Sequence, residues 1–184
     1  ELARDFALRH PNLVVLHEER AGKGNAVRRG VLEARGEYRF ICDADLSMPI
    51  EDLEKFLPPV LDGFDVVIAS REAPGAVRYN EPPYRHFGGS AINLIIRSLI
   101  LPGLNDTQCG FKCFRAEAAE KIFRQQTLGG WSFDIEVLYL ARRNHMSMVE
   151  IPVHWYFDAD SKVSAVRDAL HMIGDIFRIH INAL

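Results

Sequence analysis

Two aspartates separated by one residue, Asp43 and Asp45, have types and spacing that could do chemistry. They follow residues 38–42, whose apolar, aromatic and β-branched character predicts a buried strand. Because residues i and i+2 of a strand point the same way, both carboxylates can aim at one point beyond its carboxyl end, where open α/β sheets bind ligands. Their hard oxygens suit Mg²⁺ or Mn²⁺, which commonly bridge carboxylates to substrate phosphates. The pair predicts a divalent-metal site for a diphosphate, although a strand-end residue followed by a helix N-cap would also explain it.

A glycine-rich turn at residues 22–25 (GKGN) is the second candidate for chemistry. It lies between an expected strand and the start of an expected helix, where glycines let backbone amides approach a ligand and the helix end favours anions. Lys23 could reach a phosphate from this turn. The turn is not a P-loop, because the Gly-x4-Gly-Lys-Ser/Thr spacing of that motif is absent. An ordinary glycine turn with a solvated lysine explains these four residues equally well.

The elements that must position these residues alternate between strands and helices. We expect strands at 13–17, 38–42, 65–70, 111–114 and 148–156, and helices at 25–34, after Pro49, and at 84–101, 116–123, 133–144 and the C-terminal end. This alternation predicts right-handed crossovers and an α/β fold with a mostly parallel sheet and helices on both faces. The 184 residues fit a single domain, 1–184.

Composition excludes several classes of protein. The net charge of −3 argues against nonspecific nucleic-acid binding. The three cysteines are too few and too irregular for a disulfide framework and do not match a zinc spacing, which predicts reduced thiols and a cytosolic location. No apolar run is long enough to span a membrane. The chain opens directly on a helical pattern without Met, so we expect it to be part of a longer protein.

Two further stretches, 106–112 (DTQCGFK) and 131–136 (WSFDIE), complete a set of four motifs. In this order the motifs resemble the family 2 glycosyltransferases of the GT-A fold, and the resemblance runs from residue 13 to about residue 164. It is closest to the dolichyl-phosphate or polyprenyl-phosphate β-glucosyltransferases and their mannosyl relatives. The family's first strand-helix unit and its Asp-Asp-Gly-Ser stretch have no counterpart here, so the resemblance implies an N-terminally truncated domain.

The resemblance also implies roles for individual residues. Asp43 and Asp45 would bind the metal on the sugar nucleotide's diphosphate, Lys23 and Gly24 would line the nucleotide pocket, and Asp134 would lie beside the acceptor. The remaining substrate-binding residues implied are Gln108, Gly110 and Lys112 under the sugar, and Arg71, Arg85 and Lys162 at the acceptor phosphate.

Structural explanations compete with some of these roles. Asp134 also fits a first-turn carboxylate that interacts with the helix dipole, and Arg71 and Arg85 fit surface charges. Trp131 and Phe133 are expected to serve core and turn packing rather than substrate stacking.

The reaction implied is a single-step, inverting transfer of a hexose from UDP-glucose or GDP-mannose to a polyprenyl or dolichyl phosphate. Glucose is favoured over mannose, because the arginine that mannosyl enzymes carry before a late Ser-Lys pair is absent. A phosphate monoester is mostly a dianion at pH 7 and can attack without losing a proton, so Asp134 is expected to orient groups rather than act as a base. The transfer is placed at the cytosolic membrane surface. The helix at 84–101 is apolar around much of its axis, which fits contact with the membrane and fits core packing equally well.

Two alternatives remain from the sequence. Asp43, Asp45 and Ser47 also fit a haloacid-dehalogenase-type Mg²⁺-dependent phosphatase, in which the first aspartate is the nucleophile. The Gly-Asp pair that such an enzyme needs at a strand end occurs only at Gly174-Asp175, inside a helical pattern. The chain by itself could also be an inactive fragment or only a binding module.

Overall fold

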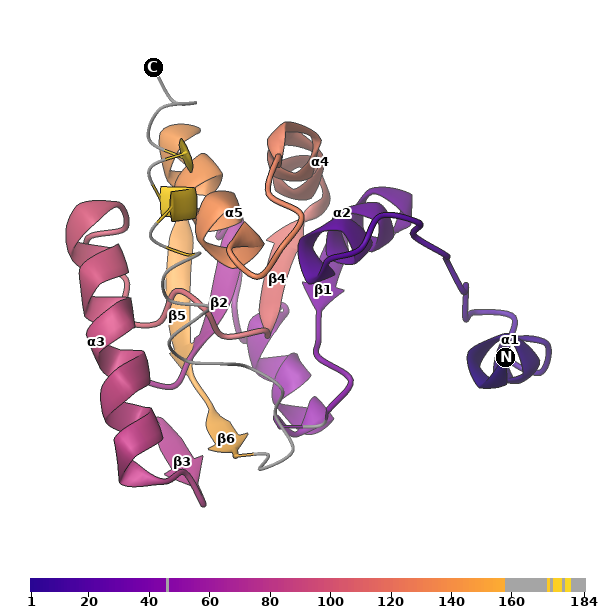
Figure 1. Cartoon of the computed structure of the whole chain (residues 1–184). Coiled ribbons are helices and arrows are strands. Elements are labelled where there is room, and N and C mark those ends of the chain that lie inside the picture. The colour runs from indigo at the N-terminus through magenta and orange to yellow at the C-terminus, as the bar shows by residue number, and fades with distance from the viewer. Residues whose placement is uncertain (46, 158–171, 173, 177, 180–184) are drawn as a thin grey trace.

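The computed structural model describes residues 1–45, 47–157, 172, 174–176 and 178–179, and it leaves out the side chains of 84–89, 91 and 92. Figure 1 shows a central sheet with helices packed against it. The α/β architecture expected from the alternating elements is confirmed.

The central sheet has the strand order β1-β4-β2-β5. Its strands are β1 (Tyr38–Ile41), β4 (Lys112–Arg115), β2 (Val66–Ser70) and β5 (Met148–Pro152). β4 runs antiparallel to both β1 and β2, whereas β2 and β5 are parallel. The sheet is therefore mixed, and the prediction of a mostly parallel sheet is wrong in this respect. The reversed direction of β4 brings its first residue, Lys112, opposite the last residue of β1, Ile41. The loop before β4 thus reaches the sheet edge at which β1 ends.

Helices cover one face of the sheet. They are α2 (Lys23–Glu33), α3 (Pro83–Leu99), α4 (Ala116–Gln125) and α5 (Phe133–Arg143). Their apolar side chains form one hydrophobic cluster with Val66, Ile68 and Phe114 of the sheet. α4 shows the underlying pattern, since its buried residues recur at the spacing of one helical face.

The opposite face packs against η1 (Ile50–Phe56), a 3₁₀-helix where the sequence predicts a helix after Pro49. Phe40, Phe56 and Phe111 meet edge to face there, with ring centroids 4.4 to 5.4 Å apart. The N-cap of η1 is Pro49, so the suggestion that Asp45 caps this helix is wrong.

A second, two-stranded sheet joins β3 (Val77–Tyr79) to β6 (His154–Tyr156) in parallel. The expected strand at 148–156 is thus divided between two sheets at Val153, and β3 lies where no strand or helix was expected. Among the described residues, no helix combines the length and the apolar composition needed to cross a bilayer.

The N-terminal segment differs most from expectation. It contains α1 (Leu2–Ala7) and an extended stretch that projects away from the sheet in Figure 1. The buried strand predicted at 13–17 is wrong, because Leu13 to Leu16 are all exposed and pair with no strand in the described part of the chain. A strand needs a neighbour for its backbone groups and a surface for its apolar side chains, and this stretch lies beside neither.

Candidate functional site

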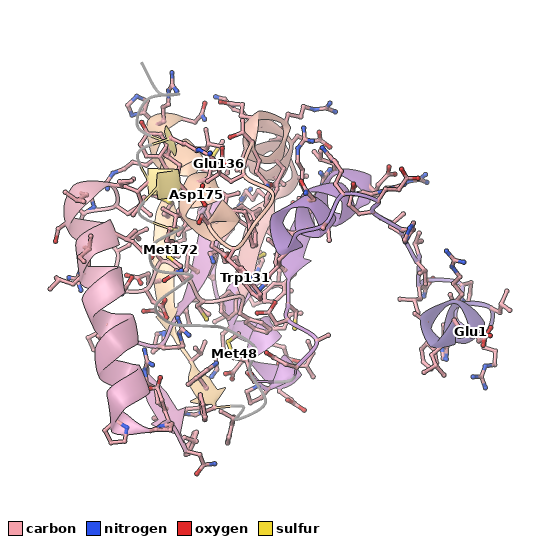
Figure 2. The ribbon with its side chains drawn as sticks, viewed as in Figure 1. Glu1, Met48, Trp131, Glu136, Met172 and Asp175 are labelled. Atoms are coloured by element: carbon pink, nitrogen blue, oxygen red, sulfur yellow. The ribbon has the colours of Figure 1, made fainter. Side chains whose placement is uncertain are left out.

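Residues from the four motifs meet where β1 ends. The ammonium of Lys23, the first residue of α2, lies 2.6 Å from Asp43 Oδ1. The same Nζ lies 5.3 Å from the ring centroid of Trp131. The carboxylate of Asp43 fills the space beside Gly110 where any other residue would place its Cβ. Figure 2 shows Trp131 at the turn that leads into α5.

The glycines of the 22–25 turn allow a close approach between two backbone segments. Gly22 has a φ of +126°, and a Cβ on Gly24 would lie 2.6 Å from the carbonyl oxygen of Leu128. The amide of Asn25 donates to the Gly129 carbonyl oxygen at 3.2 Å. The turn therefore docks the start of α2 against the residues before α5 and places Lys23 beside Trp131. The nucleotide-pocket role of Lys23 and Gly24 stays a prediction.

Beneath this surface lies a buried ion pair between Lys112 and Asp134. Lys112 is completely buried, and its Nζ lies 2.5 Å from Asp134 Oδ1 and 2.5 Å from the carbonyl oxygen of Cys109. Burial raises the pKa of the Asp134 carboxyl, although the charges of Lys112 and Lys23 oppose the rise. Lys112 is thus engaged inside the protein rather than presented at its surface.

The two aspartates offer different environments. Asp45 Oδ1 accepts a hydrogen bond from the amide of Ser47 at 3.0 Å, whereas Asp43 is paired with Lys23. Within the described residues, no three His, Cys, Asp or Glu side chains are grouped closely enough to enclose a metal ion. Two partly exposed carboxylates do fit Mg²⁺ or Mn²⁺, because such ions take their other ligands from water and substrate phosphates. Burial and the two neighbouring aspartates raise the pKa of the Cys42 thiol.

Arg71 lies in a second ionic network that begins at the end of β2. Its Nε and Nη2 donate to Asp106 Oδ2 and Oδ1 at 2.7 and 3.0 Å, and its backbone amide donates to Oδ2 at 3.0 Å. Burial opposes ionisation of Asp106, but the Arg71 guanidinium lowers the pKa of this carboxyl to about 2. The guanidinium of Arg71 is therefore already neutralised, and its contact with an acceptor phosphate stays a prediction.

Most members of this network had no role predicted from the sequence. Arg78 pairs with Glu72 at 2.6 Å and with Glu81 at 2.7 Å. Both Arg71 and Arg78 lie over the ring of Trp155, at 5.4 and 5.7 Å from its centroid. Asp106 stood inside a quoted motif, so its position was visible from the sequence, but its partner Arg71 lies 35 residues away along the chain.

The remaining predicted residues are only partly placed. Gln108 donates from Nε2 to Met172 Sδ at 3.1 Å. Arg85 belongs to α3, but its side chain is not described, and Lys162 lies outside the described residues. Phe133 is fully buried, as expected, whereas the indole of Trp131 is 52% exposed and borders the site instead of the core.

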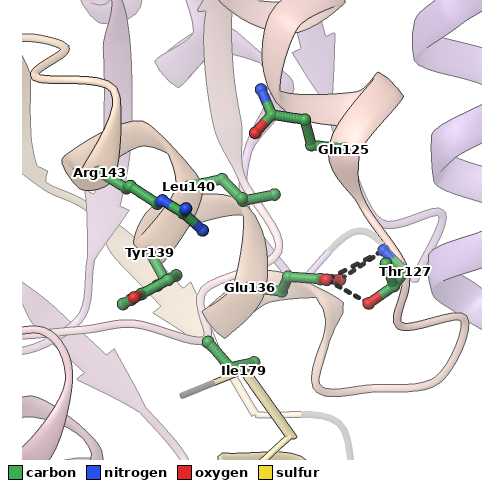
Figure 3. A pocket seen from close by; sticks show the side chains of 7 residues that line it. All are labelled: Gln125, Thr127, Glu136, Tyr139, Leu140, Arg143 and Ile179. Carbon is green, nitrogen blue, oxygen red and sulfur yellow. Dashed lines mark hydrogen bonds between the residues drawn. The ribbon is translucent and has the colours of Figure 1, made fainter. Parts of the chain in front are cut away.

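A cavity of about 240 Å³ opens beside the C-terminal half of α5 and contains none of the residues of this site (Figure 3). Glu136 lines it, but the carboxylate is fully engaged with the turn before α5. It accepts from the amide and hydroxyl of Thr127 and from the amide of Leu128 at 2.6 to 3.0 Å. The glutamate of the 131–136 motif therefore fixes the turn that carries Gly129.

Comparisons with known proteins give a consistent result. The family model described as "Glycosyl transferase family 2" matches residues 1–123. A dolichyl-phosphate beta-glucosyltransferase (ALG5C) of Trichomonas vaginalis is 35% identical over 98% of this chain and 56% of its own length. The corresponding enzyme of Dictyostelium discoideum is 31% identical over 91% of this chain and 53% of its own. This chain thus spans little more than half the length of these relatives.

A solved structure supports the fold. Glucosyl-3-phosphoglycerate synthase from Mycobacterium tuberculosis, in complex with Mn²⁺, UDP-glucose and phosphoglyceric acid, superposes with a TM-score of 0.61. The match covers 94% of this chain and 58% of that chain at 14% sequence identity. At this identity the similarity shows a shared fold and nothing more about the reaction.

Proposed function

The chain belongs to glycosyl transferase family 2, and from this we propose that it moves glucose from UDP-glucose to a dolichyl or polyprenyl phosphate. Its relatives named dolichyl-phosphate beta-glucosyltransferases support this donor sugar and acceptor over GDP-mannose. The observation that carries the proposal is the meeting of Lys23, Asp43, Gly110 and Asp134 from four elements at one sheet end.

Some residues of the site would contact the donor, and others would lie beside the acceptor. Asp43 and Asp45 would hold Mg²⁺ or Mn²⁺, which supplies positive charge to a leaving diphosphate when bound. Lys23 would add a second positive charge on the same side. The acceptor phosphate, a dianion at pH 7, needs no base to attack the anomeric carbon. Asp134, held by Lys112, would orient groups beside the acceptor.

The family match removes the phosphatase alternative. Asp175, the acidic residue that a phosphatase would need at a strand end, lies in a helix and accepts a hydrogen bond from the Ser132 hydroxyl at 2.7 Å. The direct test offers the protein labelled UDP-glucose or GDP-mannose with polyprenyl phosphate, with and without Mn²⁺. Glucosyl lipid formed only with metal is the expected result. Transfer of mannose alone would overturn the donor assignment, and no transfer with intact nucleotide binding would leave only a binding module.

Asp134→Asn is expected to lower kcat by less than about tenfold, because the dianion argument leaves no proton for this carboxylate to remove. A general base would contribute about 100-fold or more. The measurement is kcat against pH, at a temperature where circular dichroism shows the variant to be folded. A loss above 100-fold together with loss of the acid limb of the pH profile would identify Asp134 as an obligatory base.

We also place α3 against the membrane surface from which a lipid acceptor would come. Leu94, Ile95 and Leu99 are 57%, 46% and 65% exposed, whereas Ile96 is completely buried. The exposed apolar side chains can rest on the lipid surface without disturbing the core. This contact would hold the protein at the cytosolic face of the membrane.

Replacing Leu94 and Leu99 with Gln is expected to lower binding to phosphatidylcholine vesicles by at least about tenfold, since each leucine loses roughly 1 kcal/mol of apolar burial. Flotation with polyprenyl phosphate in the vesicles measures the bound fraction. Ser98→Gln, at an exposed polar position of the same turn, is the matched control. Equal flotation of all three proteins would show that α3 does not contact the membrane.

A further inference from the structure

Lys112 is a charged side chain with no exposure to solvent. It is the first residue of β4, the strand hydrogen-bonded to both β1 and β2, so its backbone is fixed from two sides. Burying an unpaired ammonium group costs a large desolvation free energy. Two short contacts of Lys112, to Asp134 Oδ1 and to the Cys109 carbonyl oxygen, offset this cost. A residue with this burial cannot touch a substrate at the surface.

These two contacts connect separate parts of the site. Asp134 belongs to the first turn of α5. Cys109 precedes Gly110, against which the carboxylate of Asp43 lies. One ammonium group therefore connects the residue proposed beside the acceptor with the turn that supports the residue proposed to hold the metal.

We propose that Lys112 is a positioning residue that holds Asp134 and the Cys109–Gly110 turn in place, and through that turn Asp43. This inference rests on the function proposed above, and it replaces the direct contact with the sugar expected from the sequence. The residues proposed to face the substrate are thus held from an inner strand of the sheet, and strands position site residues more precisely than loops do.

Stability alone does not explain this ion pair, since replacing a buried ion pair with packed hydrophobic residues is often neutral or stabilising. The ion pair contributes what an apolar pair cannot, which is a carboxyl group held in one place by an ammonium group. Lys112 opposes the effect of burial on the Asp134 carboxyl and so favours its charged form.

Lys112→Met is the direct test. We expect the titration midpoint of Asp134, followed by ¹³C NMR of labelled aspartate, to rise by at least one pH unit. We also expect the order parameter of the Gly110 amide to fall from about 0.85 to below about 0.6. Lys23→Met is the control for the titration, because the charge of Lys23 acts on Asp134 more weakly than that of Lys112. Unchanged titration and unchanged Gly110 mobility in a folded Lys112→Met variant would overturn the proposal.

Because Lys112→Met leaves Asp134 buried without its partner, it could unfold the chain. The double variant Lys112→Met/Asp134→Leu restores packing without charge and is expected to melt within a few degrees of the unaltered protein. Its Gly110 amide should still become mobile, and a rigid Gly110 in this variant would also overturn the proposal.

Kinetics distinguish this inference from the function on which it rests. If Lys112 acts through Asp134, then Lys112→Met and Lys112→Met/Asp134→Asn should lower kcat equally. If the two residues act independently, the fold-losses in kcat from the two substitutions should multiply. Multiplying effects would overturn the proposal. Absence of transfer in the unaltered protein would instead contradict the proposed function, and the NMR measurements, which need no substrate, would still decide the role of Lys112.

Discussion

Replacing Asp43 with asparagine is expected to lower kcat for glucose transfer by at least about 100-fold, which corresponds to about 3 kcal/mol of transition-state stabilisation. Asparagine keeps the shape that fits against Gly110, so the loss would arise from the missing charge. Without it, a divalent cation would lose a ligand where the diphosphate leaves. The measurement is kcat at saturating UDP-glucose over a range of Mn²⁺ concentrations. Removal of metal with EDTA should reproduce the loss in the unaltered protein.

The ion pair with Lys23 provides the competing explanation for such a loss. If Asp43 serves only to hold Lys23, then Lys23→Met should cost as much as Asp43→Asn, and the double variant should cost no more. Asp62→Asn is the matched control, because Asp62 is 71% exposed and pairs with Arg115 far from the site. Near-normal transfer by both Asp43→Asn and Asp45→Asn would remove the metal assignment.

Asp106→Asn is expected to lower the free energy of unfolding by about 3–5 kcal/mol, the range found when one partner of a buried ion pair is removed. The half-buried Arg71 guanidinium would lose the counter-charge that the buried Asp106 supplies. Urea denaturation at pH 7 measures the change. Asp62→Asn again serves as control, and its exposed ion pair should contribute less than about 1 kcal/mol. If the two substitutions lowered the free energy of unfolding equally, the Arg71–Asp106 pair would stabilise the fold no more than an exposed ion pair does.

The contribution of the Arg71–Asp106 pair to the free energy of unfolding is expected to decrease at acid pH. The pKa of Asp106 is lowered from 3.8 to about 2 in the folded protein, so its contribution is fully present above pH 4 and is lost as the pH falls toward 2. The depression corresponds to about 2 kcal/mol. The difference in unfolding free energy between the unaltered protein and Asp106→Asn should therefore narrow over this interval. A difference that stays constant from pH 5 to pH 2 would contradict the assignment.

The Arg71–Asp106 pair also bears on the site itself. The amides of Asn105 and Asp106 donate to Glu150 of β5 at 2.7 and 2.8 Å, and the amide of Gln108 donates to Asp106 Oδ1 at 3.1 Å. The loop that ends at Gly110 is thus held at its start by the buried carboxylate of Asp106 and the half-buried carboxylate of Glu150, and at its end by Lys112. We expect Asp106→Asn to weaken transfer as well as folding, because the loop supports Asp43.

The sequence by itself determined the family and most of the elements that border the site. The helical periodicity at 84–101 and 133–144 and the apolar runs at 38–42 and 65–70 correspond closely to α3, α5, β1 and β2. These signals are local, because each element carries its own pattern of buried side chains. The order of the four motifs was likewise readable without coordinates, and it identified the family that the comparisons confirm.

The tertiary structure alone decided which neighbours each residue has. An apolar strand has the same period of two in either direction, so nothing at 111–114 could reveal that β4 runs antiparallel and carries Gly110 to Asp43. The exposed stretch at 13–17 has the composition of a strand, but composition supplies no partner. The sequence predicted Lys112 to be a substrate ligand because it could not show which residues surround this lysine. A lysine is at the surface or in the core according to what folds over it, and here Asp134, 22 residues further along the chain, supplies the counter-charge that permits burial.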